Sequence, residues 1–167
     1  CTVLYTRFCW MDTGKFTGVK NLESASYYYG GCFVSGGFAT HDNQLRQLAY
    51  YGQCRVIAVQ YRLAPEHTFP AAHDDAQRGA EIVWQHAERL GVDKQRITLA
   101  GDSAGGHLAL VTALRLKRAG EWQPAQLILI YPMLDATAHF ESYIRNGHDY
   151  IITRDTLLSG VINYRRE

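Results

Sequence analysis

One turn in the sequence constrains the fold more than any other feature. An apolar run at 97–100 leads into Gly101-Asp102-Ser103-Ala104-Gly105 and then into a run of small and apolar residues. Glycine two positions before and after a serine is typical of a sharp strand-to-helix turn, because a Cβ at either position would collide with the strand or the helix. The turn would place the serine hydroxyl at a helix N-terminus, where free N–H groups and the helix dipole favour negative charge. The pattern predicts a nucleophilic Ser103, with the Ala104 N–H as the first donor to an oxyanion.

A second glycine-rich stretch supports this interpretation. Tyr29-Gly30-Gly31-Cys32-Phe33 follows a short aromatic strand predicted at 26–28. A backbone without bulky side chains can approach a reacting carbonyl and supply a second N–H donor. Because Gly, Ser and Ala are common in strand-to-helix turns of any α/β protein, the serine pattern gains its weight from this loop and from the flanking strand and helix.

The order of the predicted elements indicates the fold class. Strands are predicted at 2–8, 26–28, 55–61, around 97–100 and at 126–131, and helices at 41–52, at 71–91, from the serine turn to about 119, and from a Thr153 cap onward. The near-continuous apolar runs at 55–61 and 126–131 are typical of strands buried on both faces of a parallel sheet. Segments 11–24 and 62–70 are expected to be loops, the latter because of its two prolines. Alternating strands and helices predict an α/β fold, a mainly parallel sheet with helices on both faces in three layers.

Composition excludes several function classes. With 47% hydrophobic residues, 20% charged residues and a formal charge of +1, the 167 residues suit one globular domain and not a partner of nucleic acid or of an anionic membrane. No apolar run approaches the roughly 18 residues of a membrane span, and the N-terminus lacks a signal-peptide pattern, so we expect a cytoplasmic protein.

Cysteine spacing argues against a metal site. Cys1, Cys9, Cys32 and Cys54 form no C-x-x-C pair, and free thiols are expected instead of disulfides or zinc ligands. Because the chain begins at Cys1 and not at Met, we expect an N-terminus that was cut or processed.

Four blocks in this order resemble the hormone-sensitive-lipase family of α/β hydrolases, the bacterial carboxylesterase and acetylesterase group. They are Tyr27-Tyr28-Tyr29-Gly30-Gly31-Cys32-Phe33-Val34, Tyr61-Arg62-Leu63-Ala64-Pro65-Glu66 with the residues to Ala72, Gly101-Asp102-Ser103-Ala104-Gly105-Gly106, and Tyr131-Pro132-Met133-Leu134-Asp135. The resemblance runs from about residue 26 to the end. It implies an α/β-hydrolase fold and hydrolysis of small or medium acyl esters through an acyl-enzyme, without metal or cofactor. By the same resemblance Ser103 is the nucleophile, and the N–H groups of Gly30, Gly31, Cys32 and Ala104 form the oxyanion hole.

The sequence departs from the family pattern in two places. Tyr29 stands where the family loop has histidine and Cys32 where it has a third glycine, and loss of one oxyanion donor typically lowers the rate about 10² to 10³-fold. The family places its triad acid and histidine on later strands, which implies that residues 1–167 are one α/β-hydrolase domain that is incomplete at its C-terminus, with an incomplete N-terminus as a further alternative. We therefore expect the sheet to end at the strand at 127–131, leaving a hydrophobic edge that favours homo-oligomers. The alternative function is a non-catalytic fragment or a small-molecule-binding member of the same fold.

Other polar residues have competing interpretations. His107, His139 and His148 follow the serine and are candidate bases, although His107 is expected to pack locally one turn along the helix. Local roles are expected for the remaining residues. Asp135 and Asp149 are expected to be loop or cap carboxylates, and His67 and His73 to hold turn and helix-start positions. The Asp102 side chain is expected to bond into the turn, and Cys32 to be a bystander thiol. Tyr29 is expected to belong to the strand, with contact to the acyl group as the alternative.

Overall fold

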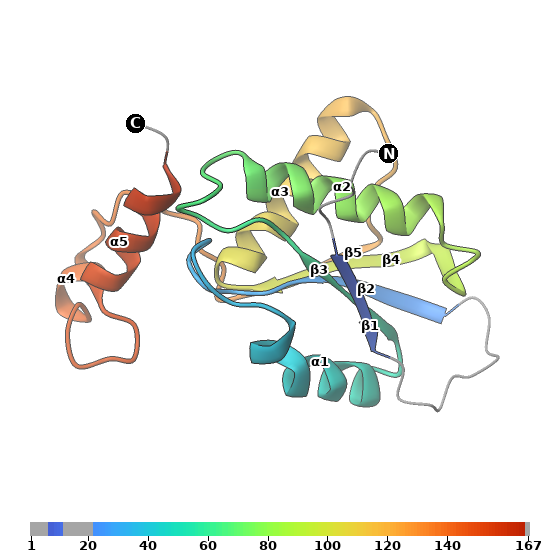
Figure 1. Ribbon diagram of the computed structural model, residues 1–167, viewed down its shortest axis with the longest axis horizontal. Helices are drawn as coiled ribbons and strands as arrows, with labels where there is room; N and C mark the ends of the chain where they lie inside the picture. The colour runs from blue at the N-terminus through green and yellow to red at the C-terminus, as the bar shows by residue number, and fades with distance from the viewer. Residues whose placement is uncertain (1–6, 12–21, 166–167) are drawn as a thin grey trace.

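A computed structural model describes residues 7–11 and 22–165. The described residues form a five-stranded sheet in the order β1-β3-β2-β4-β5 (Figure 1). The strands are β1 (Arg7–Met11), β2 (Leu22–Tyr28), β3 (Arg55–Gln60), β4 (Val92–Asp102) and β5 (Gln126–Ile130). β1 pairs antiparallel with β3, and every other pairing is parallel. The predicted α/β class with a mainly parallel sheet is confirmed.

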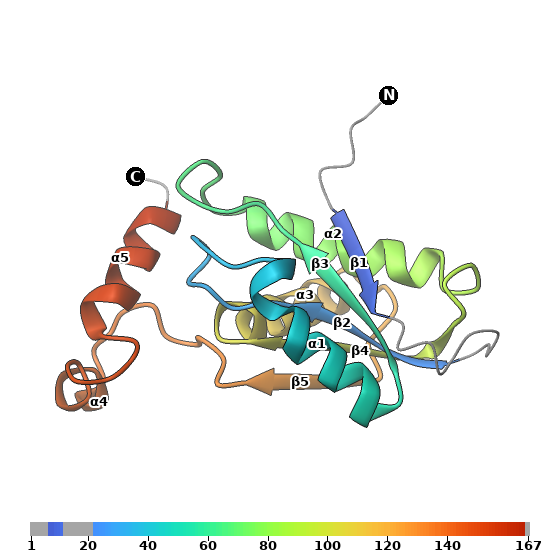
Figure 2. The same cartoon turned by 60° about the horizontal axis from the view of Figure 1, so that its bottom comes forward.

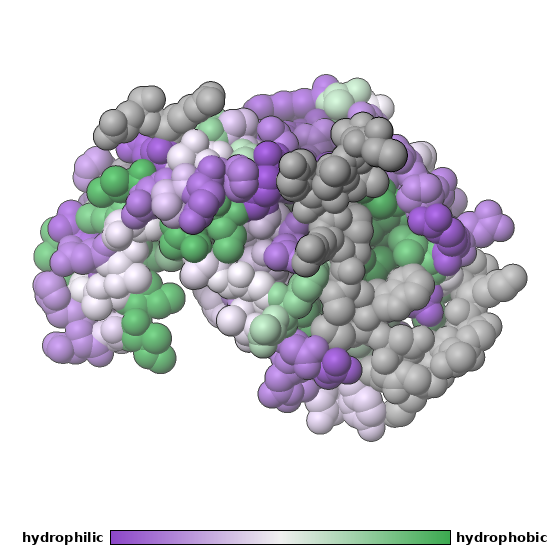
Figure 3. Space-filling view, in the orientation of Figure 1, coloured by the Kyte–Doolittle hydropathy of each residue, from purple (hydrophilic) through white to green (hydrophobic). Residues whose placement is uncertain are grey.

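Helices cover both faces of this sheet. They are α1 (Phe38–Gly52), α2 (Ala71–Gln85), α3 (Ala104–Ala119), α4 (Glu141–Arg145) and α5 (Arg154–Tyr164). Figures 1 and 2 show α1 on one face and α2 and α3 on the other, which confirms the three layers. α4 and α5 lie beyond one end of the sheet, and Figure 3 shows apolar residues gathered where this segment meets the rest of the molecule. None of the described helices is long and apolar enough to cross a membrane.

Several boundaries match the sequence expectations. β3 and β5 lie where they were predicted, α1 begins three residues before the predicted start, and Gly120 ends α3 in the left-handed conformation with φ 69°. The Thr153 hydroxyl accepts a hydrogen bond from the Thr156 N–H at 3.2 Å and so caps α5 as predicted. Segment 62–70 is a loop, also as predicted.

Other expectations were wrong. The polar residues at 22–24 were expected in a loop, but they belong to β2, because this strand fits between β3 and β4 and pairs with both. The helix predicted to Gly91 ends at Gln85; Ala87 stays fully buried in a turn, so the apolar period continues although the backbone leaves the helix. Of the strand expected at 2–8, residues 2–6 lie outside the described part, and the described strand continues to Met11.

The strand β5 was predicted to be buried on both faces, and this is wrong. β5 pairs with β4 at the end of the strand order, and the side chains of Leu127 and Ile128 are 39% and 42% exposed. The apolar edge expected at this strand is therefore present among the described residues.

The central strands determine where the site lies. Tyr27 is paired with Ala100 and Tyr28 with Gly101, so β2 and β4 end side by side. Because the two strands are parallel, the loop after β2 and the turn after β4 both leave the sheet at the carboxyl ends of the strands. This is the end at which α/β proteins bind ligands.

Candidate active site

Ser103 lies in a strained turn between β4 and α3. Its φ of 53° and ψ of −116° are unusual for a residue with a side chain, and its surface is partly exposed. A Cβ on Gly105 would lie 1.8 Å from the Tyr28 carbonyl oxygen, and a Cβ on Gly101 would lie 2.4 Å from the Gly105 carbonyl carbon. The turn therefore requires both glycines, for the steric reason that the sequence pattern predicts.

The glycine-rich loop lies directly beside this turn, because Gly105 packs against the backbone of Tyr28 and Tyr29. Three consecutive loop residues have positive φ: Gly31 at 133°, Cys32 at 52° and Phe33 at 64°. Among the hydrogen bonds of the described residues, none uses the N–H of Gly31, Cys32 or Ala104 as donor. These three N–H groups therefore have no described acceptor where the loop and the turn meet.

The Gly30 N–H, unlike those of Gly31, Cys32 and Ala104, has an acceptor. Its N–H donates to Asp102 Oδ1 at 3.0 Å, and a Cβ on Gly30 would lie 2.4 Å from Asp102 Oδ2. The expectation that the Gly30 N–H contributes to the oxyanion hole therefore does not hold.

Asp102 anchors the loop to the turn. Its side chain is nearly buried, and Oδ1 also accepts a hydrogen bond from the Tyr27 hydroxyl at 2.9 Å. On the other side, His41 Nε2 lies 3.6 Å from Asp102 Oδ2. The carboxylate therefore has a structural role, as expected, but it bonds to the loop after β2 and to Tyr27 and not into its own turn. The contribution of His41 was missed, because its position at the start of a predicted helix indicates no distant partner.

Tyr29 cannot contact an acyl group. It is 1% exposed, and its ring stacks on Tyr61 with centroids 4.6 Å apart. The Tyr61 hydroxyl donates to the Tyr29 carbonyl oxygen at 2.6 Å. Tyr29 follows the last residue of β2, so the expectation that it belongs to the strand is wrong by one residue. Its buried side chain supports the loop from inside the core, which leaves no surface for a substrate contact.

His107 packs locally, as expected. Its Nδ1 bonds the Met133 carbonyl oxygen at 2.9 Å, and its Nε2 lies 3.0 Å from Nε2 of His73. Burial lowers the pKa of His107. Both ring nitrogens are engaged, so this histidine cannot accept the serine proton in the described arrangement.

His73 is more than a helix-start residue. It is 5% exposed, and its Nδ1 lies 2.6 Å from the Tyr164 hydroxyl. Burial, and then the neighbouring His107 and Arg115, lower the pKa of His73 to about 4. No local pattern could reveal this pairing, because the two histidines are 34 positions apart.

The remaining candidates lie in surface segments. His139 and His148 are exposed, and none of the described hydrogen bonds or ion pairs connects either to Ser103. Asp135 accepts bonds from the Thr137 N–H and hydroxyl, which hold its pKa below the usual value, and Asp149 lies in a left-handed turn. Both are loop carboxylates, as expected. No group of three metal-ligating side chains lies together in the described part of the chain.

A cavity of about 590 Å³ adjoins the turn. It is mainly apolar, and Phe33, Met133 and α5 form much of its wall. The Met133 N–H donates to the Ser103 carbonyl oxygen at 3.0 Å, which places this wall next to the serine backbone. Its size is in the range of small-molecule pockets.

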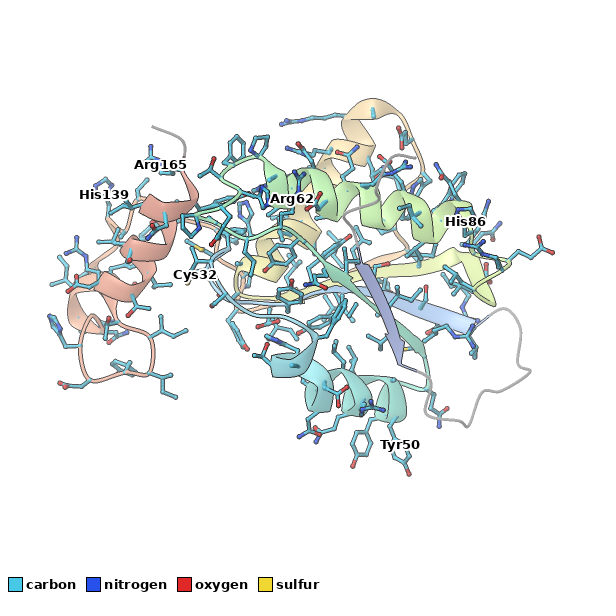
Figure 4. All side chains as sticks on the ribbon, in the orientation of Figure 1. Cys32, Tyr50, Arg62, His86, His139 and Arg165 are labelled. Atoms are coloured by element: carbon cyan, nitrogen blue, oxygen red, sulfur yellow. The ribbon has the colours of Figure 1, made fainter. Side chains whose placement is uncertain are left out.

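Cys32 lies between α5 and the sheet (Figure 4). A Cβ on Gly160 of α5 would be 2.5 Å from the Cys32 Cβ, so the helix lies directly on the loop. Burial raises the pKa of the Cys32 thiol, which favours the unreactive protonated form and agrees with the bystander interpretation. Cys32 and Cys54 are free thiols among the described residues.

The proteins that this chain resembles include ester hydrolases. A family profile described as the alpha/beta hydrolase fold matches residues 25–166. The chain is 39% identical over 137 residues to carboxylesterase NlhH of Mycobacterium tuberculosis, covering 82% of this chain and 43% of that protein. It is 40% identical over 132 residues to an ethyl acetate hydrolase of Pseudomonas putida, covering 78% and 42%. A hyperthermophilic esterase from the archaeon Pyrobaculum calidifontis superposes with a TM-score of 0.86 at 39% identity, over 89% of this chain and 50% of that one. The chain thus spans half or less of each relative.

Proposed function

The chain belongs to the α/β-hydrolase family, as a homologue of its hormone-sensitive-lipase carboxylesterases, and from this we propose that it carries the nucleophile and oxyanion hole of a serine ester hydrolase. In this proposal residues 1–167 are part of a single α/β-hydrolase domain. The triad acid and histidine come from residues beyond Glu167, as the family resemblance implies.

One observation carries the proposal. The strained Ser103 immediately precedes α3, and the turn that holds it packs through Gly105 against the backbone of Tyr28 and Tyr29, directly before Gly31 and Cys32. We propose that the N–H groups of Gly31, Cys32 and Ala104 bind the carbonyl oxygen that becomes negative when the serine attacks.

The proposed reaction is acyl transfer. Ser103 Oγ attacks the ester carbonyl carbon while a base accepts its proton, and the oxygen of the tetrahedral intermediate is held by the three N–H groups. The C–O bond to the alcohol then breaks, the alcohol leaves with a proton, and water hydrolyses the acyl-enzyme to the acid. The apolar cavity beside the turn supports esters of small or medium acids, and a relative named ethyl acetate hydrolase is consistent with short chains.

The test is p-nitrophenyl acetate hydrolysis by the 167-residue chain and its Ser103→Ala variant. We expect the wild type to exceed the variant by about tenfold, because only the wild type can form the acyl-enzyme, whereas both keep the residual rate that the oxyanion hole and binding supply without a complete triad. An exposed substitution, His148→Gln, serves as the control and should not change the rate. Equal rates for wild type and Ser103→Ala would contradict catalysis by this polypeptide.

A second candidate is a small-molecule-binding member of the same fold. The observation in its favour is that His107 has both ring nitrogens engaged, and no other described histidine is bonded toward Ser103. This candidate predicts equal hydrolysis rates together with saturable binding of a non-hydrolysable short-chain amide, measured by calorimetry.

A further inference from the structure

Three side chains, two buried and one partly buried, connect α5 to the serine turn. The Tyr164 hydroxyl lies 2.6 Å from His73 Nδ1, His73 Nε2 lies 3.0 Å from His107 Nε2, and His107 Nδ1 lies 2.9 Å from the Met133 carbonyl oxygen. The three residues come from α5, α2 and α3. The esterase mechanism proposed above uses none of them.

Only one arrangement of protons satisfies this chain when both rings are neutral. A carbonyl oxygen can only accept, so His107 Nδ1 carries a proton and its Nε2 accepts. His73 Nε2 must then donate, which leaves His73 Nδ1 to accept from the Tyr164 hydroxyl. Burial lowers the pKa of both histidines and raises that of Tyr164, so neutral rings and a protonated phenol are the favoured forms.

The Tyr164 end of the chain lies against the oxyanion loop. Its ring stacks on Phe33 with centroids 4.2 Å apart, and its carbonyl oxygen accepts the Phe69 N–H at 2.8 Å. One turn earlier, Gly160 packs on Cys32. The end of α5 therefore covers the two loop residues that follow Gly31.

The other end of the chain lies against the nucleophile. Met133 accepts from His107 through its carbonyl and donates through its own N–H to the Ser103 carbonyl oxygen at 3.0 Å. The same Ser103 oxygen also accepts the His107 N–H at 3.1 Å. The hydrogen-bonded chain thus reaches from the helix over the oxyanion loop to the backbone of the serine.

We propose that Tyr164 is a positioning residue of the ester-hydrolase site: its hydroxyl, acting through the His73–His107 pair, holds α5 on the oxyanion loop and sets that loop relative to Ser103. The role of Tyr164 in catalysis rests on the proposed function, whereas its role in docking α5 can be measured without any hydrolysis.

The experiment compares Tyr164→Phe, which keeps the ring stacked on Phe33, with the control Tyr150→Phe, whose side chain is exposed on the same segment. The readout is alkylation by iodoacetamide, with the modified cysteines quantified by peptide mass spectrometry. Cys54 is the internal reference, because it is a free, half-buried thiol whose pKa is raised by burial like that of Cys32. We expect Tyr164→Phe to raise Cys32 alkylation about fivefold relative to Cys54, the factor for one hydrogen bond lost from a local opening equilibrium.

Nitrogen NMR of the histidine rings supplies a second readout. In the wild type, His73 should carry its proton on Nε2 and His107 on Nδ1. In Tyr164→Phe, His73 should lose its preference for the tautomer that is protonated on Nε2. Unchanged Cys32 alkylation, an equal rise at Cys32 and Cys54, or the opposite wild-type tautomers would each overturn the proposal. None of these readouts needs hydrolysis. If the chain is inactive but Tyr164→Phe still raises Cys32 alkylation selectively, the result counts against the proposed function and not against the docking role of Tyr164.

Discussion

The serine turn and the oxyanion loop both hold residues with side chains at positive φ, but the two segments differ in what surrounds those residues. In the serine turn, glycine occupies both positions where a Cβ would strike backbone, and Ser103 alone has a side chain at positive φ. In the oxyanion loop, Cys32 and Phe33 are both at positive φ and both have side chains. A non-glycine residue in the left-handed region is unfavourable unless surrounding structure holds it there.

The difference indicates where each geometry is specified. The residues that specify the serine turn lie within two positions of Ser103, and they are glycines because the backbone of the turn and of Tyr28 leaves no room for a Cβ. The loop is held by partners far along the chain: Asp102 on the Gly30 N–H, Tyr61 on the Tyr29 carbonyl, and α5 on Cys32 and Phe33. Substitutions in the turn should therefore act alone, and substitutions in the loop should depend on their partners.

The largest effect is expected at Gly105. Gly105→Ala would put a Cβ 1.8 Å from the Tyr28 carbonyl oxygen, so the start of α3 would have to move away from the end of β2. We expect a loss of about 3–5 kcal/mol in the free energy of unfolding, or no folded protein. Urea unfolding measures it. Gly37→Ala is the control, because nothing lies within 4 Å of a Cβ there, and its effect should stay within about 0.5 kcal/mol. Similar values for the two variants would remove the claim that the turn is specified by its glycines.

The sequence predicts the locally specified parts of this molecule well. Gly101, Gly105 and the apolar run before them were sufficient for the strand, turn and helix, and Gly120 and Thr153 were sufficient for two helix ends. Their determinants lie within a few residues of what they determine.

Contacts between distant residues could not be predicted in the same way. Asp102 takes the Gly30 N–H across 72 positions, and that contact removed one expected oxyanion donor. The apolar pattern of β5 predicts a strand but carries no information on its place in the strand order, so its burial was overestimated. The family resemblance supplied the serine, the loop and their order, and the partners that hold the loop emerged only from the fold.

A smaller effect, with a strong dependence on context, is expected where α5 meets the loop. Gly160→Ala would place a Cβ 2.5 Å from the Cys32 Cβ, and we expect it to lower stability by about 2 kcal/mol. Cys32→Gly removes that contact and relieves the positive φ, so it should restore most of the loss in the double variant. A double-mutant cycle in urea should give a coupling of about 1 kcal/mol or more. Additive effects would mean that the loop, like the serine turn, is specified without its partner.

The smallest expected effect is a pH dependence of stability that arises beside the oxyanion loop and not in the serine turn. The pKa of His73, beside the loop and α5, is lowered to about 4 from its ordinary value of 6.5 by burial and then by His107 and Arg115, against an opposing effect of Asp74. Between these values the unfolded chain binds the proton and the folded chain does not, so stability is full above about pH 6.5 and falls as the pH drops toward 4. From pH 7 to pH 5 we expect a loss of about 1–2 kcal/mol from this group. His73→Gln should reduce the pH dependence of urea unfolding by that amount, whereas Gly37→Ala should leave it unchanged. If His73→Gln and wild type lose stability in parallel, the histidine pair is not the acid-sensitive part of the loop's support, and the contrast between a locally specified turn and a partner-held loop would then rest on packing alone.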